Sequence, residues 1–201
     1  MRGLYLVTPN WDNTEQLLAV TEQALQADVA LLQYRHKSAD AALRRSQASA
    51  LLALARQYGV PLVINDHIDL CEEIGADGLH VGGTDMTVAQ ARARLGPDCI
   101  VGASCYGELA LARAAQAAGA SYVAFGGFYP SLVKQYPVTT PPAIVTQARG
   151  ELAVPVVVIG GMTPDNAAPL VALGADLVAA ISSVYQSSEP ALAVRRFHAL
   201  F

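Results

Sequence analysis

The sequence predicts a single-domain (β/α)8 barrel, the TIM-barrel fold, from three observations. The chain has 201 residues, of which 53% are hydrophobic and only 15% charged, and this suits one domain with a large core over residues 1–201. Short apolar runs rich in Val, Ile and Leu alternate with helical stretches along the whole chain, as in a parallel sheet covered by helices. The same Gly-Ala-polar turn recurs between helix and strand, at residues 75–77, 119–121 and 174–176.

Each element follows from this pattern in chain order. The strands are expected at residues 3–8, 30–35, 62–65, 78–81, 100–104, 122–126, 156–160 and 177–181. The helices are expected at residues 13–27, 39–58, 68–74, 87–95, 108–118, 142–152, 164–173 and 189–200.

The ends of these elements carry recognisable signals. Asn13 and Thr163 are N-cap residue types, and glycine after a helix adopts the left-handed conformation that ends it. Eight strand–helix units in about 200 residues point to a closed barrel, with an open doubly wound sheet as the alternative. No GxGxxG motif follows the first strand, which disfavours the open sheet.

Composition excludes several classes of function. A net charge of −4 gives no general attraction to nucleic acid. No apolar run reaches the length of about 18 residues that a membrane span needs, so we expect no membrane partner. The three cysteines show no paired spacing, which indicates a reducing cytoplasm without a disulfide framework or zinc site.

The stretch from Leu31 to Lys37 is the first candidate site. Alternate residues of a strand share a face, so Gln33, Arg35 and Lys37 point one way, and Tyr34 and His36 point to the helices or the rim. Two cations and an amide at a strand end suit a phosphate or carboxylate. Taken alone, the stretch is better explained as an edge strand whose polar face meets water, and only the rest of the chain reverses that preference.

Two carboxylates follow neighbouring strands. In a (β/α)8 barrel the site lies at the carboxyl ends of the strands, which brings Asp66 and Asp85 near Arg35 and Lys37. Two carboxylates beside an anion site are the usual way to hold Mg²⁺ with a substrate phosphate. The alternative for each aspartate is a helix N-cap.

A second anion site is expected on the other side of the barrel. Gly160-Gly161 precedes a helix start, so its backbone N–H groups can cradle a phosphate, and Ser182-Ser183 can add hydroxyls. Lys134 lies in the long 128–141 loop, and long loops in compact domains are usually functional. Two anion sites suit two phosphorylated small-molecule substrates, one of them a diphosphate. His80, within a strand, is expected to be a packed residue, and Cys105 is at most a weak candidate nucleophile.

These segments, in this order and spacing, resemble the thiamine-phosphate synthase family over nearly the whole chain. The resemblance rests on Gln33-Tyr34-Arg35-His36-Lys37, Asn65-Asp66, the segment 80–85, Gly102-Ala103-Ser104, the segment 128–134, the segment 159–162 and Ile181-Ser182. It implies a transferase that joins hydroxymethylpyrimidine diphosphate to a thiazole phosphate, giving thiamine phosphate and pyrophosphate. The implied mechanism is dissociative and assisted by Mg²⁺.

The resemblance also implies roles for individual residues. Arg35, Lys37, Ser104 and Lys134 would be catalytic, and Asp66 and Asp85 would hold Mg²⁺. The implied pyrimidine diphosphate site comprises Gln33, Arg35, Lys37, Asn65, Ser104 and Lys134. The implied thiazole phosphate site comprises Ser131, Val133, Gly161, Ile181 and Ser182. The residues Tyr34, His36 and Leu132 belong to the same substrate-binding segments.

Three positions depart from the family pattern, namely Val133, Gly83 and His67. Val133 replaces a usual hydroxyl, and one lost hydrogen bond costs about 0.5–1.5 kcal/mol. A protonated His67 would oppose Mg²⁺. The alternatives are a related thiazole tautomerase, which would place a histidine where Tyr106 stands, or a barrel that binds thiazole phosphate or thiamine phosphate without catalysis. A homo-oligomer is possible under each reading.

Overall fold

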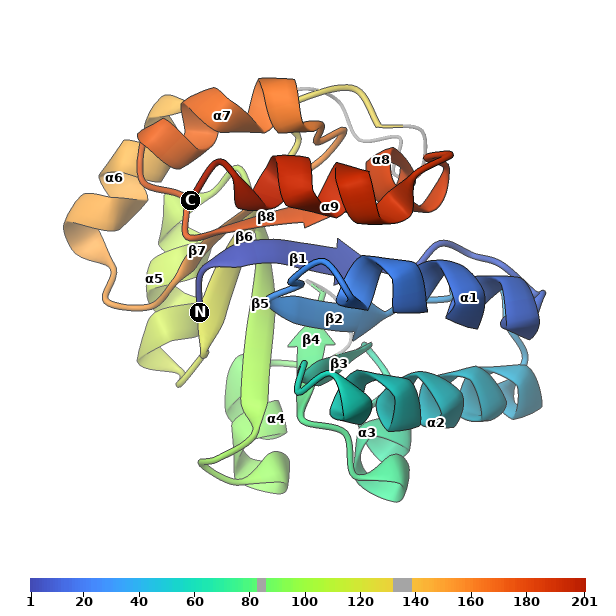
Figure 1. Ribbon diagram of the computed structural model, residues 1–201. Coiled ribbons are helices and arrows are strands. Elements are labelled where there is room, and N and C mark those ends of the chain that lie inside the picture. The colour runs from blue at the N-terminus through green and yellow to red at the C-terminus, as the bar shows by residue number, and fades with distance from the viewer. Residues whose placement is uncertain (83–85, 132–138) are drawn as a thin grey trace.

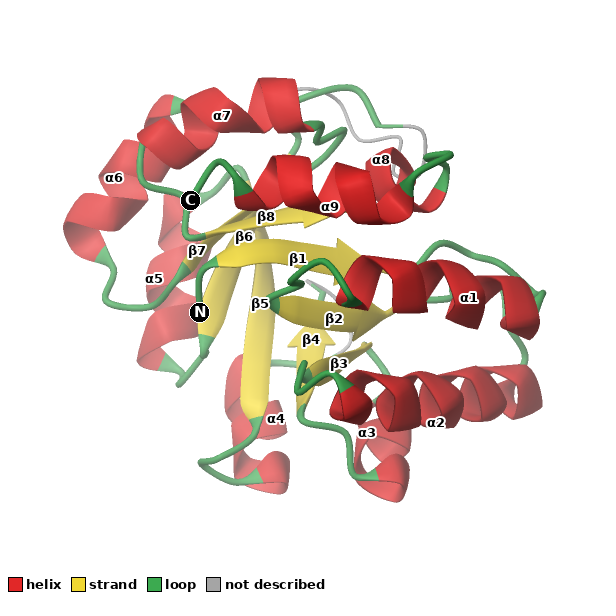
Figure 2. Cartoon of the chain, viewed as in Figure 1, coloured by secondary structure: helices red, strands yellow, loops and turns green. Residues whose placement is uncertain are grey.

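The computed structural model describes residues 1–82, 86–131 and 139–201, and its core is a closed parallel barrel. Eight strands pair in chain order, and β8 closes the ring on β1. Figure 2 shows the strands gathered inside a layer of helices. The strands are β1 (Gly3–Val7), β2 (Leu31–Tyr34), β3 (Leu62–Asn65), β4 (Gly78–Val81), β5 (Ile100–Tyr106), β6 (Tyr122–Gly126), β7 (Val156–Ile159) and β8 (Leu177–Ala180). The predicted (β/α)8 fold is confirmed.

The described helices form the outer layer, and four of them begin at a side-chain cap. Asn13 and Thr163 accept the N–H of the third residue after them, as the sequence predicted, and Asp40 and Thr87 do the same. The helices are α1 (Thr14–Leu25), α2 (Ala41–Gln57), α3 (Ile68–Ile74), α4 (Val88–Leu95), α5 (Leu109–Ala117), α6 (Ala143–Glu151), α7 (Pro164–Ala172), α8 (Ser182–Tyr185) and α9 (Pro190–His198).

Two elements differ from the sequence prediction. Strand β5 runs on to Tyr106 through a register shift against β6 between Ser104 and Tyr106. The four-residue helix α8 was missed, because a segment this short that opens with two serines carries too little helical pattern to recognise.

The core has two layers, and alternation along each strand divides them. One layer lies between barrel and helices and contains Leu4, Leu6 and Leu32. The other fills the barrel interior, where Tyr5, Val7, Leu31 and other inward residues pack together. Inward side chains near the carboxyl ends of the strands are therefore the ones that reach the barrel mouth.

The two ends of the barrel have different roles. Figure 1 shows both chain termini at the end where β1 starts, with α8 at the opposite end, beyond the strand arrowheads. The Arg2 guanidinium lies 5.8 Å from the centre of the Phe201 ring, which ties the termini together. The opposite end is free to carry the site.

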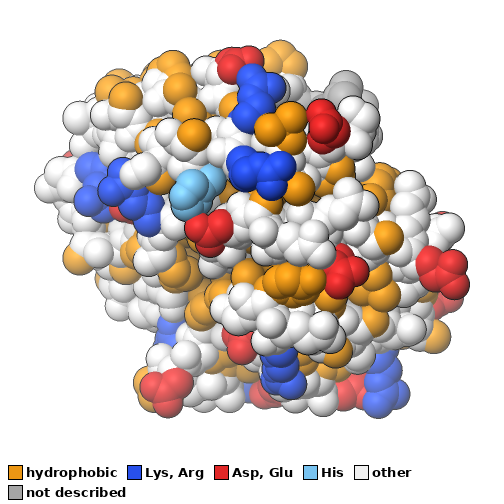
Figure 3. Space-filling view, in the orientation of Figure 1, with side chains coloured by type: hydrophobic (Ala, Val, Ile, Leu, Met, Phe, Trp, Pro, Cys, Tyr) orange, Lys and Arg blue, Asp and Glu red, His pale blue; other side chains and the backbone are white. Residues whose placement is uncertain are grey.

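Cationic and anionic side chains are interspersed on the face drawn in Figure 3. Among the described residues, we find no helix that combines the length and hydropathy needed to cross a bilayer.

Candidate active site

A charged cluster lies at the carboxyl ends of β2 and β3. The Lys37 ammonium donates to Asp66 Oδ2, and Asn65 Nδ2 donates to the same oxygen at 2.7 Å. The N–H of Gly82, which follows β4, donates to Asp66 Oδ1 at 3.3 Å. The carboxylate is thus held between the ends of three neighbouring strands.

Asp66 reaches this position through an unusual backbone conformation. Its φ of 61° lies in the left-handed region, and the N-cap position of α3 falls on His67, whose side chain makes no cap hydrogen bond. The alternative of an Asp66 N-cap is therefore wrong. Partial burial alone would raise the Asp66 pKa, but the Lys37 ammonium and the Gly82 N–H lower it below its ordinary value.

His67 does not add positive charge to this cluster at neutral pH. Burial lowers its pKa, and Arg44 lowers it further. A histidine with a lowered pKa is neutral at pH 7, which removes the expected conflict with a bound cation.

Arg35 points into the barrel, as strand alternation predicted. Together with Gln33, His80 and Ser104 it lines a small interior cavity of about 20 Å³. Its backbone is fixed by Thr8, whose Oγ1 accepts the Arg35 N–H at 2.8 Å and donates to the Arg35 carbonyl at 3.1 Å. Thr8 ends the first predicted strand, and no pattern in the sequence assigned it a role.

The Tyr34 side chain faces the helix layer, and its assignment among the substrate-binding residues stays a prediction. Its hydroxyl donates to Gln47 Oε1 of α2 at 3.0 Å, and the ring packs in the outer core. The orientation expected from strand alternation is confirmed. Tyr34 packs β2 against α2 and does not reach the barrel mouth.

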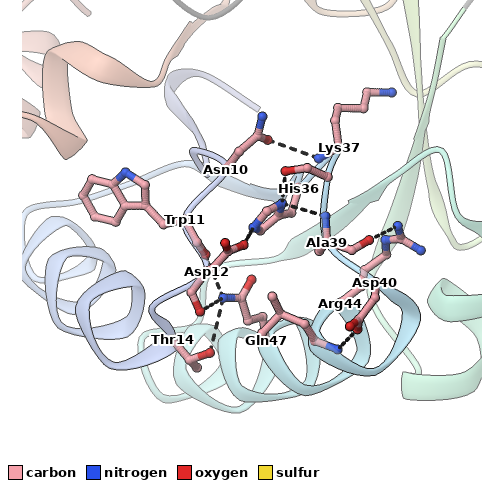
Figure 4. Close-up of polar contacts among 12 residues, drawn as sticks. Asn10, Trp11, Asp12, Thr14, His36, Lys37, Ala39, Asp40, Arg44 and Gln47 are labelled. Carbon is pink, nitrogen blue, oxygen red and sulfur yellow. Dashed lines mark hydrogen bonds and ion pairs between the residues drawn. The ribbon is translucent and has the colours of Figure 1, made fainter.

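His36 likewise faces away from the barrel interior and holds the loop after β1 (Figure 4). Its Nδ1 accepts the Ala39 N–H at 3.1 Å, so the ring proton is on Nε2, which lies 3.0 Å from Asp12 Oδ1. The Lys37 N–H donates to Asn10 Oδ1 at 3.1 Å. The structure gives His36 a supporting position beneath Lys37, and its assignment among the substrate-binding residues stays a prediction.

The sequence analysis did not assign Tyr5, His80 and Tyr122, which lie in the barrel interior, to the site. Tyr5 and Tyr122, from β1 and β6, are hydrogen-bonded at 2.6 Å, and Gln33 donates to Tyr5. His80 bridges Tyr122 and Ser104, at 2.9 Å to each. His80 is buried as expected, but as part of a polar network. The sequence did contain a signal for this network, because Tyr5, His80 and Tyr122 are polar residues at inward-facing positions of otherwise apolar strands.

The opposite side of the mouth combines glycine backbone with uncharged side chains, several of which carry hydroxyl groups. A cavity of about 200 Å³ is lined by Ser104, Tyr106, Gly107, Ala124, Gly126, Gly127, Tyr129, Ser131, Thr139, Thr140, Ile159 and Gly160. Gly161 follows with a φ of 60°, and a Cβ there would lie 2.1 Å from the Pro130 carbonyl oxygen. This glycine is needed for the close approach of the β7–α7 and β6–α6 loops.

The β7–α7 turn is further held by a capping box. Thr163 and Asn166 exchange the reciprocal hydrogen bonds of that motif, and Asn166 Nδ2 donates to the Gly161 carbonyl at 2.9 Å. The Gly161 carbonyl is thus directed toward α7. Ile181 and Ser182 lie at the neighbouring end of β8, as N-cap and first residue of α8.

Four predicted site residues lie outside the described ranges, namely Asp85, Leu132, Val133 and Lys134. Gly83 lies outside as well. Within the described ranges no group of three or more His, Cys, Asp or Glu is arranged to bind a metal. Asp66 therefore stands as the described carboxylate of the predicted Mg²⁺ site.

Cys105 is unsuited to be a nucleophile. Its thiol is buried and lies 3.7 Å from the Ala103 carbonyl oxygen. Burial raises the pKa of this thiol to about 12. The thiolate needed for attack is therefore absent at neutral pH.

Known proteins match this chain over nearly its full length. The family model described as thiamine monophosphate synthase matches residues 4–184. A thiamine-phosphate synthase of Janthinobacterium sp. (strain Marseille) is 66% identical over 201 residues, covering 100% of this chain and 97% of the relative. One from Xylella fastidiosa (strain 9a5c) is 48% identical over 200 residues, covering 100% of this chain and 85% of the relative.

Solved structures agree with these matches. Thiamine phosphate pyrophosphorylase from Pyrococcus furiosus superimposes with a TM-score of 0.85 at 27% identity, covering 98% of this chain and 94% of that one. A 3-hexulose-6-phosphate synthase shares the fold alone, with a TM-score of 0.74 at 20% identity and full coverage of both chains. By sequence and by fold, the chain belongs to the thiamine monophosphate synthase family and is an enzyme of the transferase class.

Proposed function

We propose that the enzyme condenses 4-amino-2-methyl-5-hydroxymethylpyrimidine diphosphate with a thiazole phosphate, giving thiamine phosphate and pyrophosphate. The family name and the matching relatives support this assignment. One observation of the structure supports it most, namely the arrangement of Lys37, Asp66 and Asn65 across the mouth from the Gly160-Gly161 turn. A charged end and a backbone-lined end suit two different phosphorylated ligands.

The diphosphate would lie at the charged end. Arg35 projects inward from β2, and Lys37 is half-exposed at the rim of the same strand. A guanidinium and an ammonium there stabilise the negative charge that grows on a leaving diphosphate. Lys134, whose structure is outside the described ranges, would supply a third cation.

The residues fit a magnesium ion. Asp66 offers a carboxylate with a lowered pKa, and Asp85 follows β4, the strand that pairs with β3. Oxygen ligands from one or two carboxylates plus substrate phosphates are what Mg²⁺ takes in proteins. When bound, the ion would add positive charge against the leaving group.

The chemical step we propose is dissociative. The bond between the pyrimidine methylene carbon and the diphosphate oxygen breaks, and its electron pair leaves with pyrophosphate. The thiazole nitrogen then gives its lone pair to the carbon. This route asks for no side-chain nucleophile, which agrees with the buried, protonated Cys105. Ser104, which lines both cavities, would contact the pyrimidine substrate between the two ends.

A product assay tests the proposal. Purified enzyme receives both substrates with Mg²⁺, and thiamine phosphate and pyrophosphate are measured in equal amounts. Reactions lacking either substrate or chelated with EDTA serve as controls. Isomerisation of the thiazole alone would indicate the tautomerase. Saturable ligand binding without any product would indicate a non-catalytic barrel. Either result would remove the synthase assignment.

A further inference from the structure

A row of hydrogen-bonded side chains crosses the barrel interior beneath the mouth. Gln33 of β2 donates to the Tyr5 hydroxyl of β1, which bonds the Tyr122 hydroxyl of β6 at 2.6 Å. Tyr122 in turn lies 2.9 Å from His80 Nδ1 of β4, and His80 Nε2 lies 2.9 Å from Ser104 Oγ of β5. We call Gln33, Tyr5, Tyr122, His80 and Ser104 the interior chain.

The interior chain is buried in an otherwise apolar layer. The exposed fractions of Tyr5 and Tyr122 are 1% and 0%, and both rings pack with Leu31 and Val157. Burial raises the pKa of both tyrosines far above neutrality, so each hydroxyl keeps its proton. A buried polar row is stable only when each donor has an acceptor, and this requirement restricts where each proton points.

The hydrogen bonds of the interior chain all run in one donor-to-acceptor direction, from Gln33 towards Ser104. The Gln33 amide nitrogen can only donate, so the Tyr5 oxygen accepts from it. Tyr5 then gives its own proton to Tyr122, and Tyr122 gives its proton to His80 Nδ1. The imidazole proton is left on Nε2, where it points at Ser104 Oγ. In the opposite direction the buried Tyr5 proton would have no acceptor in this row.

The direction has a consequence at the site. We infer that Tyr122 is a positioning residue, which fixes His80 in the tautomer protonated on Nε2. Ser104 Oγ then accepts a hydrogen bond from His80 Nε2–H. The Ser104 hydroxyl proton is therefore directed into the cavity. Ser104 lines both the small interior cavity and the larger one. A hydroxyl in that state donates to an acceptor atom of the ligand. That this ligand is the pyrimidine diphosphate rests on the proposed function.

Gly102 supports a specific position for Tyr122. A Cβ at Gly102 would lie 2.0 Å from Tyr122 Cζ and 2.2 Å from its hydroxyl oxygen. The two residues pair across β5 and β6. The absence of a side chain at 102 is thus what allows the tyrosine hydroxyl to reach the centre of the barrel. The His80 and Tyr122 rings are stacked at 5.7 Å, which fixes their relative orientation further.

The tautomer of His80 is measurable without any catalysis. Enzyme labelled with ¹⁵N-histidine is recorded in long-range ¹H–¹⁵N spectra at neutral pH, and His80 is assigned from its absence in His80→Gln. In the wild type we expect the proton on Nε2. In Tyr122→Phe we expect both tautomers and a fall of about tenfold in kcat/KM for the pyrimidine diphosphate, the factor that corresponds to one hydrogen bond.

The matched control is Tyr185→Phe. Tyr185 is also fully buried and its hydroxyl bonds Thr21 at 2.8 Å, on the helix side of the barrel. This variant should leave the His80 tautomer unchanged and keep kcat/KM within about twofold. Comparing the two variants therefore separates the general effect of losing a buried tyrosine hydroxyl from the specific effect of losing the Tyr122 hydroxyl.

Each outcome decides the inference. A wild-type proton on Nδ1 would overturn the direction, whether or not Tyr122→Phe folds. An unchanged tautomer in Tyr122→Phe, or a changed tautomer with wild-type kcat/KM, would overturn the positioning role. A wild-type enzyme that forms no product would refute the proposed function instead, and the spectrum would still report the tautomer.

Discussion

The Gly161→Ala substitution tests how the backbone end of the site is built. Gly161 has a φ of 60°, and its ideal Cβ would lie 2.1 Å from the Pro130 carbonyl oxygen and 3.2 Å from Tyr129 Cβ. Normal van der Waals contact is roughly 3.5 Å, so the added methyl must move one of the two loops by about 1 Å. The change acts on backbone, which yields less easily than a flexible side chain.

The magnitude has two parts. Left-handed backbone costs an alanine about 1–2 kcal/mol. Forcing a methyl into an occupied space costs about 1–3 kcal/mol more, unless the loops separate. If they separate, a 1 Å displacement at a binding site can cost on the order of 100-fold in productive binding. We expect KM for the thiazole phosphate to rise about 10- to 100-fold.

A second glycine with a similar φ separates the steric clash of an added methyl group from the cost of left-handed backbone. Gly75 has a φ of 64°, and a Cβ there would meet nothing within 4 Å. Gly75→Ala should therefore show the backbone cost alone, about 1–2 kcal/mol or ~2–8 °C in Tm, with unchanged KM. Steady-state kinetics and thermal unfolding of both variants are the measurements. Gly161→Ala with a wild-type KM and a Tm no lower than that of Gly75→Ala would refute the reasoning.

Four further predictions concern single residues. Asp66→Asn keeps a residue type that tolerates left-handed backbone, so Tm should stay near wild type while turnover with Mg²⁺ falls at least about 100-fold; a parallel loss of Tm would make Asp66 structural. Lys134→Ala should also cut turnover strongly at constant Tm. Gln47→Leu should lower the free energy of unfolding by about 1–3 kcal/mol in urea titration, because the amide joins Trp11 and Thr14 to α2; unchanged stability would contradict this. Gly102→Ala should cost more than about 3 kcal/mol, since its Cβ would overlap the Tyr122 ring, and wild-type Tm would exclude that overlap.

The fold was predictable because local signals and the barrel agree. Strand β2 is the clearest case, because a period of two was enough to send Gln33 and Arg35 inward and Tyr34 outward. The helix starts at Asn13 and Thr163 were equally readable, since capping involves residues three positions apart.

The sequence could not reveal contacts that only the closed barrel creates. His80 meets Tyr122 and Ser104 across 42 and 24 residues of chain, so no local pattern connects them. The position of Asp66 depends on its left-handed φ, which places the N-cap of α3 at His67. An aspartate just before a helix is compatible with the N-cap conformation and with the left-handed one, so the sequence could not distinguish them. The proposed roles of Asp85, Val133 and Lys134 stay predictions.

Charged side chains form one end of the site and glycine backbone contributes to the other, and the proposed chemistry explains this difference. A leaving diphosphate gains negative charge in the transition state, so full cations such as Lys37 and Arg35 stabilise it more than they stabilise the bound substrate. The phosphate of the thiazole keeps its charge through the reaction, so backbone N–H groups near Gly160 and Gly161 only need to hold it. Variants at the charged end should therefore lower kcat, and variants at the glycine end should raise KM with little change in kcat. The division between side chain and backbone thus follows from where charge changes during the reaction.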